Sequence, residues 1–394
     1  MDAEAARLVG GSDGRGAAVG DRSGVSDVRV FPRLPPRAAS PTADGGAAGR
    51  GASAPACGPA LVWFRNDLRL EDHAALSAAN AAATAVVPVF CFDPREHGQG
   101  TAGCERSGPA RAAFVCGALR DLRMALRARG SDLIVRVGLP EEVLPQLAAS
   151  VGAAHVYCHG EATDAERRAE AAVAAALQRR GAALEVLWGG TLLHPEDFPF
   201  KLGALFRAGA TPSFAEFRER VGGGGRDGRG GRKAARLVAV RAPLEAPQFF
   251  KGFPAGCGIT PGELPTLQQL GFIGEGLVAA AGAAPAMGAG LSSSEQRVLE
   301  RMRGFDTGHG RGPAAHEPLT QAFVTKAWPW LAVGCVSPRT LYHAFANHER
   351  SQHNGARPGP ERRRKHAQEG DCGASWLMFE LLWRDFFRFA LAAA

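Results

Sequence analysis

The sequence predicts an α/β fold: an N-terminal five-stranded, parallel, doubly wound sheet, then a long irregular linker and a partial all-α domain. Three observations predict it. Short apolar runs alternate with helical stretches over residues 59–221, residues 222–290 are rich in Gly, Ala and Pro without apolar periodicity, and helical patterns return over residues 291–394. We expect residues 1–58 to form a tail that is disordered or carries a targeting signal. We expect residues 222–290 to form a flexible linker.

Five short apolar runs predict the buried strands of the sheet. They are Ala60–Phe64, Ala85–Phe92, Asp132–Val137, His155–Cys158 and Ala183–Trp188. In a doubly wound sheet, ligands bind beyond the carboxyl ends of the strands. We therefore expect binding residues in the loops Arg65–Asp72, Asp93–Gly108 and His159–Asp164.

Apolar spacing and capping residues predict the helices. One face of the longest helical stretch carries Val115, Leu119, Leu122 and Leu126, spaced by three or four residues. Ser337 followed by Pro338 has the composition of a helix start, with the serine as N-cap. A final, strongly aromatic helix is expected over Ser375–Leu391.

Charge and composition narrow the classes of function. The 394 residues include 46 Lys and Arg against 39 Asp and Glu, a formal charge of +7, and basic residues concentrate in residues 222–240 and 350–366. Such stretches either steer a polyanion or are solvated insertions. No apolar run approaches the ~18 residues of a membrane span, so no membrane partner is expected. Residues 1–58 fit a chloroplast or mitochondrial targeting segment, or a plain disordered tail in a cytoplasmic or nuclear protein.

The eight cysteines are dispersed along the chain without a C-x-x-C pair. A zinc site or a secreted disulfide framework needs clustered cysteines, so we expect an intracellular, reducing location and no metal. Cys91 and Cys335 lie inside apolar runs and are expected to be buried thiols. His194 and His309 have no partners at metal-binding spacing.

The loop after the first strand reads R-N-D-L-R-L-E-D and lacks G-x-G-x-x-G, which argues against a classical NAD(P) dehydrogenase. Its charged residues are Arg65, Asp67, Arg69 and Asp72. We expect these side chains to form a charge network between domains rather than a ligand site.

Four segments carry more specific information than composition does. They are Leu61–Leu76 with its W-F-R-N-D-L-R-L-E-D run, Trp188–Phe200, Val324–Arg339 and Trp376–Phe389. In order and spacing they resemble the photolyase/cryptochrome family, and F-E-L-L-W-R-D-F-F-R-F most resembles its DASH cryptochromes. The resemblance covers about residues 58–221 and 291–389.

The resemblance implies a helical domain that binds FAD and, in the DASH branch, a 5,10-methenyltetrahydrofolate antenna between the domains. It implies blue-light sensing, or light-driven repair of cyclobutane pyrimidine dimers, preferentially in single-stranded DNA. The excited flavin would supply the electron while the protein positions it. Flipping the lesion out of the stack costs less in a single strand. We expect a monomer.

The resemblance also suggests cofactor-binding residues. The flavin-phosphate loop falls on Val324, Thr325, Lys326, Ala327 and Trp328. Backbone N–H groups and small hydroxyls cradle a diphosphate in such a loop, and here Thr325 and Lys326 keep that chemistry. Glu161 resembles the acidic residue that DASH proteins place against the folate. Taken alone, Glu161 is an exposed acid that opens a helix.

In the last helix, the resemblance assigns Glu380 and Trp383 to a catalytic lesion pocket. The predicted DNA-binding residues are Glu380, Trp383, Arg384 and Arg388. A carboxylate can bond a pyrimidine edge, an aromatic ring can stack on it, and an arginine can hold a phosphate. The alternative is an amphipathic core helix with a surface Glu–Arg pair.

The chain ends five residues past the fourth segment, whereas the resemblance implies a helical domain that continues. We therefore expect this chain to be inactive or incomplete as a light-driven lyase. Two other hypotheses stay open. One is a non-catalytic module that binds folate or a nucleotide and nucleic acid; the other is an unrelated nucleotide-dependent α/β enzyme that binds at Arg65–Asp72.

Overall fold

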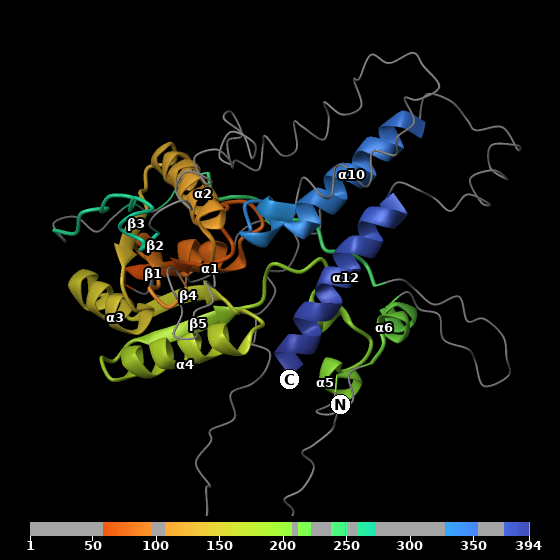
Figure 1. The fold of residues 1–394 in the computed structure, drawn as a ribbon, viewed down its shortest axis with the longest axis horizontal. Coiled ribbons are helices and arrows are strands. Elements are labelled where there is room, and N and C mark those ends of the chain that lie inside the picture. The colour runs from red at the N-terminus through yellow and green to blue at the C-terminus, as the bar shows by residue number, and fades with distance from the viewer. Residues whose placement is uncertain are drawn as a thin grey trace, which may run out of the picture. The chain divides into compact units, whose positions relative to one another are not determined.

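The computed structural model describes residues 58–96, 107–206, 212–221, 238–248, 250, 252, 258–272, 328–353 and 374–393, all within the contact unit Phe31–Ala394 (Figure 1). The strands are β1 (Ala60–Phe64), β2 (Val86–Phe92), β3 (Ile134–Val137), β4 (His155–His159) and β5 (Ala183–Leu187). The helices around them are α1 (Ala74–Ala82), α2 (Pro109–Arg127), α3 (Pro140–Val151) and α4 (Asp164–Gln178). After the sheet come the 3₁₀ turn η1 (Pro195–Asp197), α5 (Leu202–Leu205), α6 (Phe214–Val221), α10 (Pro338–His353) and α12 (Ala374–Ala393).

All five strands are parallel and lie in the order β3-β2-β1-β4-β5. The five apolar runs of the sequence are therefore confirmed as strands, each boundary agreeing within two residues. The chain steps outward from β1 to β2 and β3, then crosses back to β4 on the other side of β1. This reversal creates the switch point between β1 and β4, at which doubly wound sheets bind ligands.

Helices cover both faces of the sheet, as predicted. Val62 and Phe64 of β1 share a core with α1 and α2, while Leu61 and Trp63 share the opposite core with α3 and α4. This alternation follows from the two-residue period of a strand. The predicted apolar face of α2 is confirmed, since Leu119 and Leu126 are fully buried in the first core.

The described parts of residues 222–290 contain no helix or strand, but they are packed against the α/β domain. The backbone N–H of Val135 donates to the carbonyl of Pro261 at 2.7 Å, and Arg123 Nη2 donates to the carbonyl of Gly262 at 2.8 Å. Phe272 is buried in the core of α1 and α2. This differs from a flexible linker, because the free edge of β3 binds this segment.

The predicted helix start at Ser337 and Pro338 is confirmed, since Ser337 Oγ accepts from the backbone N–H of Arg339 at 3.1 Å at the start of α10. The aromatic helix α12 extends slightly beyond the expected Ser375–Leu391 at both ends. The domain boundaries at residues 222 and 291 stay predictions. In the part of the chain that the structure describes, no helix is long and apolar enough to cross a membrane.

Candidate functional site

The loop after β1 connects the α/β domain to the helical region through Asp72. Arg339 Nη2 lies 2.6 Å from Asp72 Oδ1, and the Ser337 hydroxyl donates to Asp72 Oδ2. Arg69 Nη1 donates to the Gly334 carbonyl at 3.1 Å. Burial opposes the charged form of Asp72, but Arg339 and Arg69 outweigh it and hold its pKa below the usual value. The expected interdomain charge network is confirmed at Asp72.

Asp67, His73 and His159 form a fully buried cluster between β1, α1 and β4. His73 Nε2 and His159 Nδ1 lie 2.9 Å and 2.8 Å from the same oxygen of Asp67. The two imidazole rings stack with their centroids 4.3 Å apart. These are the residue types and spacings of a metal site, so the protonation of the rings decides what the cluster can do.

The backbone at the start of α1 fixes that protonation. The N–H of Leu76 donates to His73 Nδ1 at 3.1 Å, which makes Nδ1 the acceptor and leaves the ring proton on Nε2. A protonated Nε2 has no lone pair for a metal. Burial lowers the pKa of His73 to about 4, so the ring is neutral at physiological pH. The arrangement is that of a structural cluster around a carboxylate.

Glu161 lies between β4 and α4, next to the switch point, and is buried. Its Oε1 accepts from Asn66 Nδ2 at 3.1 Å, and its Oε2 accepts from Arg388 Nη2 of α12 at 2.7 Å. Burial alone would raise the pKa of Glu161, yet Arg388 and Arg65 lower it below the usual value. Glu161 is therefore a buried, ionised carboxylate shared by the two regions, not the exposed acid of the alternative reading.

A cavity of about 460 Å³ opens at the carboxyl ends of β1 and β2, beside the start of α4. Phe64 and Phe90 line its apolar side, while Asn66 and Glu166 line its polar side. Asn66 Nδ2 donates to both Glu161 and Glu166 at 3.1 Å. Asn66 therefore links the wall of the cavity to Glu161.

Three polar contacts hold α12 against the α/β domain. Asp385 accepts from the backbone N–H groups of Leu192 and Leu193 at 3.0 Å and 2.9 Å, and Arg384 donates to the Gly190 carbonyl. Burial raises the pKa of Asp385 to about 7, although the two N–H donors favour its charged form. Burial lowers the pKa of Arg384 to about 10. These charged groups of α12 therefore serve the contact with the α/β domain.

The outward face of α12 is aromatic and apolar. Trp383, Phe387 and Leu391 are spaced by four residues and are 41%, 48% and 46% exposed. Phe214 of α6 meets Trp383 edge-on, with ring centroids 4.5 Å apart. Glu380, three residues before Trp383, is half-buried. This face can stack on flat rings.

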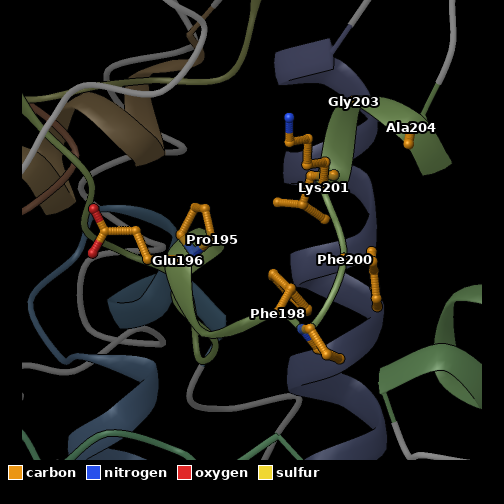
Figure 2. Close-up of a pocket in the computed structure, with 9 residues that line it drawn as sticks. Pro195, Glu196, Phe198, Phe200, Lys201, Gly203 and Ala204 are labelled. Carbon is orange, nitrogen blue, oxygen red and sulfur yellow. The ribbon is translucent and has the colours of Figure 1, made fainter.

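A second, apolar groove lies on the segment that leads from the sheet toward α5. Figure 2 shows Pro195 and Glu196 on one side and Phe198 and Lys201 on the other. Its volume is about 840 Å³. It contains none of the residues predicted for a site.

The predicted site residues have three different outcomes. Val324, Thr325, Lys326 and Ala327 lie outside the described residues, and Trp328 is half-buried against the core. The structure brings Glu161 and Arg388 together, and it places Glu380 and Trp383 on α12. Arg384 and Arg388 bond within the chain instead of facing solvent.

Two residues that position the site were not singled out from the sequence. Asn66 sits inside the W-F-R-N-D run, and its two carboxylate partners follow β4 and could not be paired with it from sequence alone. Asp385 did give a signal, because an acid in so apolar a helix needs a partner when buried.

Comparisons with known proteins identify the family. A family model described as DNA photolyase matches residues 60–220. Blue-light photoreceptor PHR2 of Arabidopsis thaliana is 34% identical over 340 residues, which cover 84% of this chain and 68% of the relative. The chain belongs to the photolyase/cryptochrome family. Cryptochrome DASH of Gloeobacter violaceus is 35% identical over 332 residues, 84% of this chain and 59% of that protein.

Solved structures agree with this family. A crystal structure of a cryptochrome from Synechocystis sp. PCC6803 matches with a TM-score of 0.60 and 28% identity, over 85% of this chain and 61% of that one. The chain thus spans between 59% and 68% of the length of these photolyase/cryptochrome proteins. The family and fold predicted from the motifs are confirmed, whereas the roles of single residues stay predictions.

Proposed function

We propose that this chain is a DASH-type cryptochrome/photolyase-like flavoprotein that senses blue light or repairs cyclobutane pyrimidine dimers in single-stranded DNA. One observation carries the proposal. The polar contacts of α12 hold it against the α/β domain, and its outward face then presents Trp383 at 41% exposure near Glu380. A rigidly held aromatic ring beside a carboxylate suits an unstacked pyrimidine.

In this proposal, Trp383 stacks on the base and Glu380 accepts a hydrogen bond from its N–H edge. The phosphates are bound elsewhere, because the contacts of Arg384 and Arg388 with Gly190 and Glu161 favour positioning roles for both arginines. Single-stranded DNA would then bind mainly by stacking.

The described residues include a candidate site for the folate antenna but not the candidate phosphate loop for FAD. Glu161 is a buried carboxylate that can accept the N–H groups of a folate ring, so it fits the antenna. The candidate flavin-phosphate loop Val324–Ala327 lies outside the described residues. When bound, a flavin supplies the light-driven electron.

An absorbance spectrum of the purified chain tests the cofactors. A flavin band that bleaches under blue light supports the full proposal, whereas a folate band alone supports an antenna-binding relative without photochemistry. A colourless protein that takes up neither added FAD nor 5,10-methenyltetrahydrofolate contradicts it.

Binding of oligo(dT) with and without a cyclobutane dimer tests the DNA part. Trp383→Ala is expected to weaken binding by about ten-fold, the effect of one lost stacking contact. Phe387→Ala is the matched control, because Phe387 is similarly exposed, at 48% against 41%, one turn further along α12. Equal losses in both variants would contradict a specific role for Trp383. Light scattering on the same samples tests the expected monomer.

The proposed location is a chloroplast or mitochondrion. Relatives from Arabidopsis thaliana and rice are named Cryptochrome DASH, chloroplastic/mitochondrial, which supports an organelle. A fluorescent protein fused behind residues 1–58 tests it, and fluorescence spread through the cytoplasm and nucleus would contradict it.

A further inference from the structure

The aromatic rings of α12 lie beside an arginine of α6. The two helices pack next to each other (Figure 1). The guanidinium of Arg218 lies over the ring of Phe379, with its Cζ atom 5.9 Å from the ring centroid. Phe379 in turn stacks with Trp383, with the ring centroids 6.1 Å apart and the ring planes inclined by 21°. One surface therefore carries a cation and two aromatic rings in succession.

The spacing of residues in α6 directs Arg218 to this surface. Phe214 and Arg218 are four residues apart, so they share one face of the helix. Phe214 meets Phe379 and Trp383 edge-on, with ring centroids 5.2 Å and 4.5 Å away. Because Phe214 fixes this face of α6 against the rings, Arg218 is held beside them one turn later.

The charge of Arg218 is available to a ligand. Its side chain is exposed, and within the described residues no ion pair joins it to a carboxylate. Arg220 differs, because its Nη2 lies 3.3 Å from Glu216 Oε1. The two arginines of α12, Arg384 and Arg388, are also engaged by acceptors within the chain. Of these four arginines, Arg218 alone is unpaired and next to the rings.

We infer that Arg218 binds a phosphate of single-stranded DNA next to the base that stacks on Trp383. The planar guanidinium can donate two parallel hydrogen bonds to phosphate oxygens while its face stays on the Phe379 ring. Because the ring restrains the arginine before DNA arrives, less conformational entropy is lost on binding. The inference rests on the proposed DNA binding and adds a phosphate contact that Arg384 and Arg388 do not supply.

The acids near Arg218 are compatible with this contact. Glu216 is paired with Arg220. Glu219 directly follows Arg218, so it projects about 100° further around the helix. Arg218 therefore presents its charge on the side of α6 that faces the rings, whereas Glu219 presents its charge on another side.

The closing experiment uses oligo(dT) with one cyclobutane dimer and, in turn, one uncharged methylphosphonate linkage at each position around the dimer. The dimer fixes the register of the strand on Trp383. For the wild-type chain, one position is expected to weaken binding by about ten-fold, the effect of a lost charge-assisted contact. Arg218→Met should bind the unmodified strand about ten-fold more weakly and lose no further affinity at that position.

The salt dependence provides a second readout. Loss of one phosphate contact should flatten the slope of log K against log salt by about 0.7 in Arg218→Met. Arg220→Met is the matched control, since it removes the same charge from the same helix at a paired position. It should keep the affinity within about two-fold and keep the methylphosphonate effect.

Circular dichroism checks the fold of each variant. If Arg218→Met does not fold, Arg218→Lys replaces it, because lysine keeps the charge and loses the planar pair of donors. Arg218→Lys is expected to bind about three-fold more weakly with an unchanged salt slope.

The outcomes separate this inference from the function on which it rests. Wild-type affinity and slope in Arg218→Met overturn the inference while DNA binding at Trp383 stands. Weaker binding with an unchanged slope and an unchanged methylphosphonate effect also overturns it, because Arg218 would then only support the ring of Phe379. An equal loss in Arg220→Met would indicate a general effect of charge and would overturn it as well. Failure of the folded wild-type chain to bind oligo(dT) overturns the proposed DNA binding together with the inference.

Discussion

The carboxylate of Asp385 accepts a hydrogen bond from the backbone N–H of Leu193 at 2.9 Å, although 192 residues separate them in the chain. The neighbouring N–H of Leu192 bonds the other carboxylate oxygen. One fully buried side chain of α12 therefore satisfies two successive amides of the loop after β5. The contact between α12 and the α/β domain depends on this carboxylate.

Asp385→Ala is expected to lower the free energy of unfolding by about 3 kcal/mol, because two buried amides lose their acceptor. Denaturant unfolding followed by circular dichroism measures this. Asp164→Ala serves as the control, since the Asp164 side chain is 72% exposed, and it should leave the midpoint nearly unchanged. A change below about 1 kcal/mol for Asp385→Ala would show that the amides find other partners.

Arg384→Met separates docking from DNA binding. Because Arg384 donates to the carbonyls of Gly190 and Leu331, its loss should cost about 2 kcal/mol of stability. It should leave the salt dependence of oligo(dT) binding unchanged. Loss of a phosphate contact would instead flatten the slope of log K against log salt by about 0.7, and that result would restore the DNA-binding role.

His73 makes stability depend on pH. Its pKa is about 4 in the folded chain, lowered by burial from 6.5. Below pH 6.5 the unfolded state takes up a proton that the folded state does not, so stability falls as the pH drops from 6.5 toward 4, by about 3 kcal/mol.

His73→Asn should remove much of this slope, because asparagine keeps the N-cap bond to Leu76 and does not titrate. Thermal unfolding midpoints measured between pH 7 and pH 4 provide the comparison. If the variant and the wild-type chain lose stability in parallel, other groups govern the acid sensitivity.

Gly334 is required where the helical region meets the loop after β1. Its φ is +72°, and an added Cβ would lie 2.1 Å from the carbonyl oxygen of Asn66. Gly334→Ala should therefore cost about 3 kcal/mol or more. Gly117→Ala in α2 is the opposite case, since nothing lies within 4 Å of its Cβ, and it should stabilise the chain by about 0.5–1 kcal/mol. Equal effects would contradict the close contact at Gly334.

Local patterns predicted much of the fold. The five strands, the buried face of α2 and the cap at Ser337 depend on residues near one another in sequence, so periodicity and capping chemistry locate them. The four motifs resembled one family, and the comparisons confirmed it. The linker was harder, because its packing on β3 depends on an edge that only the assembled sheet presents.

The sequence by itself determined the parallel sheet, the helical region and the family, because each follows from the spacing of nearby residues or from short motifs of particular residue types. The tertiary structure decided what individual charges do. The spacing of apolar residues predicted that Arg384 and Arg388 lie on a helix. Only the folded structure brings Arg388 to Glu161, 227 residues away, and Arg384 to the carbonyl of Gly190. A buried charge takes whichever partner the packing brings within hydrogen-bonding distance, and that partner is set by contacts distant in sequence.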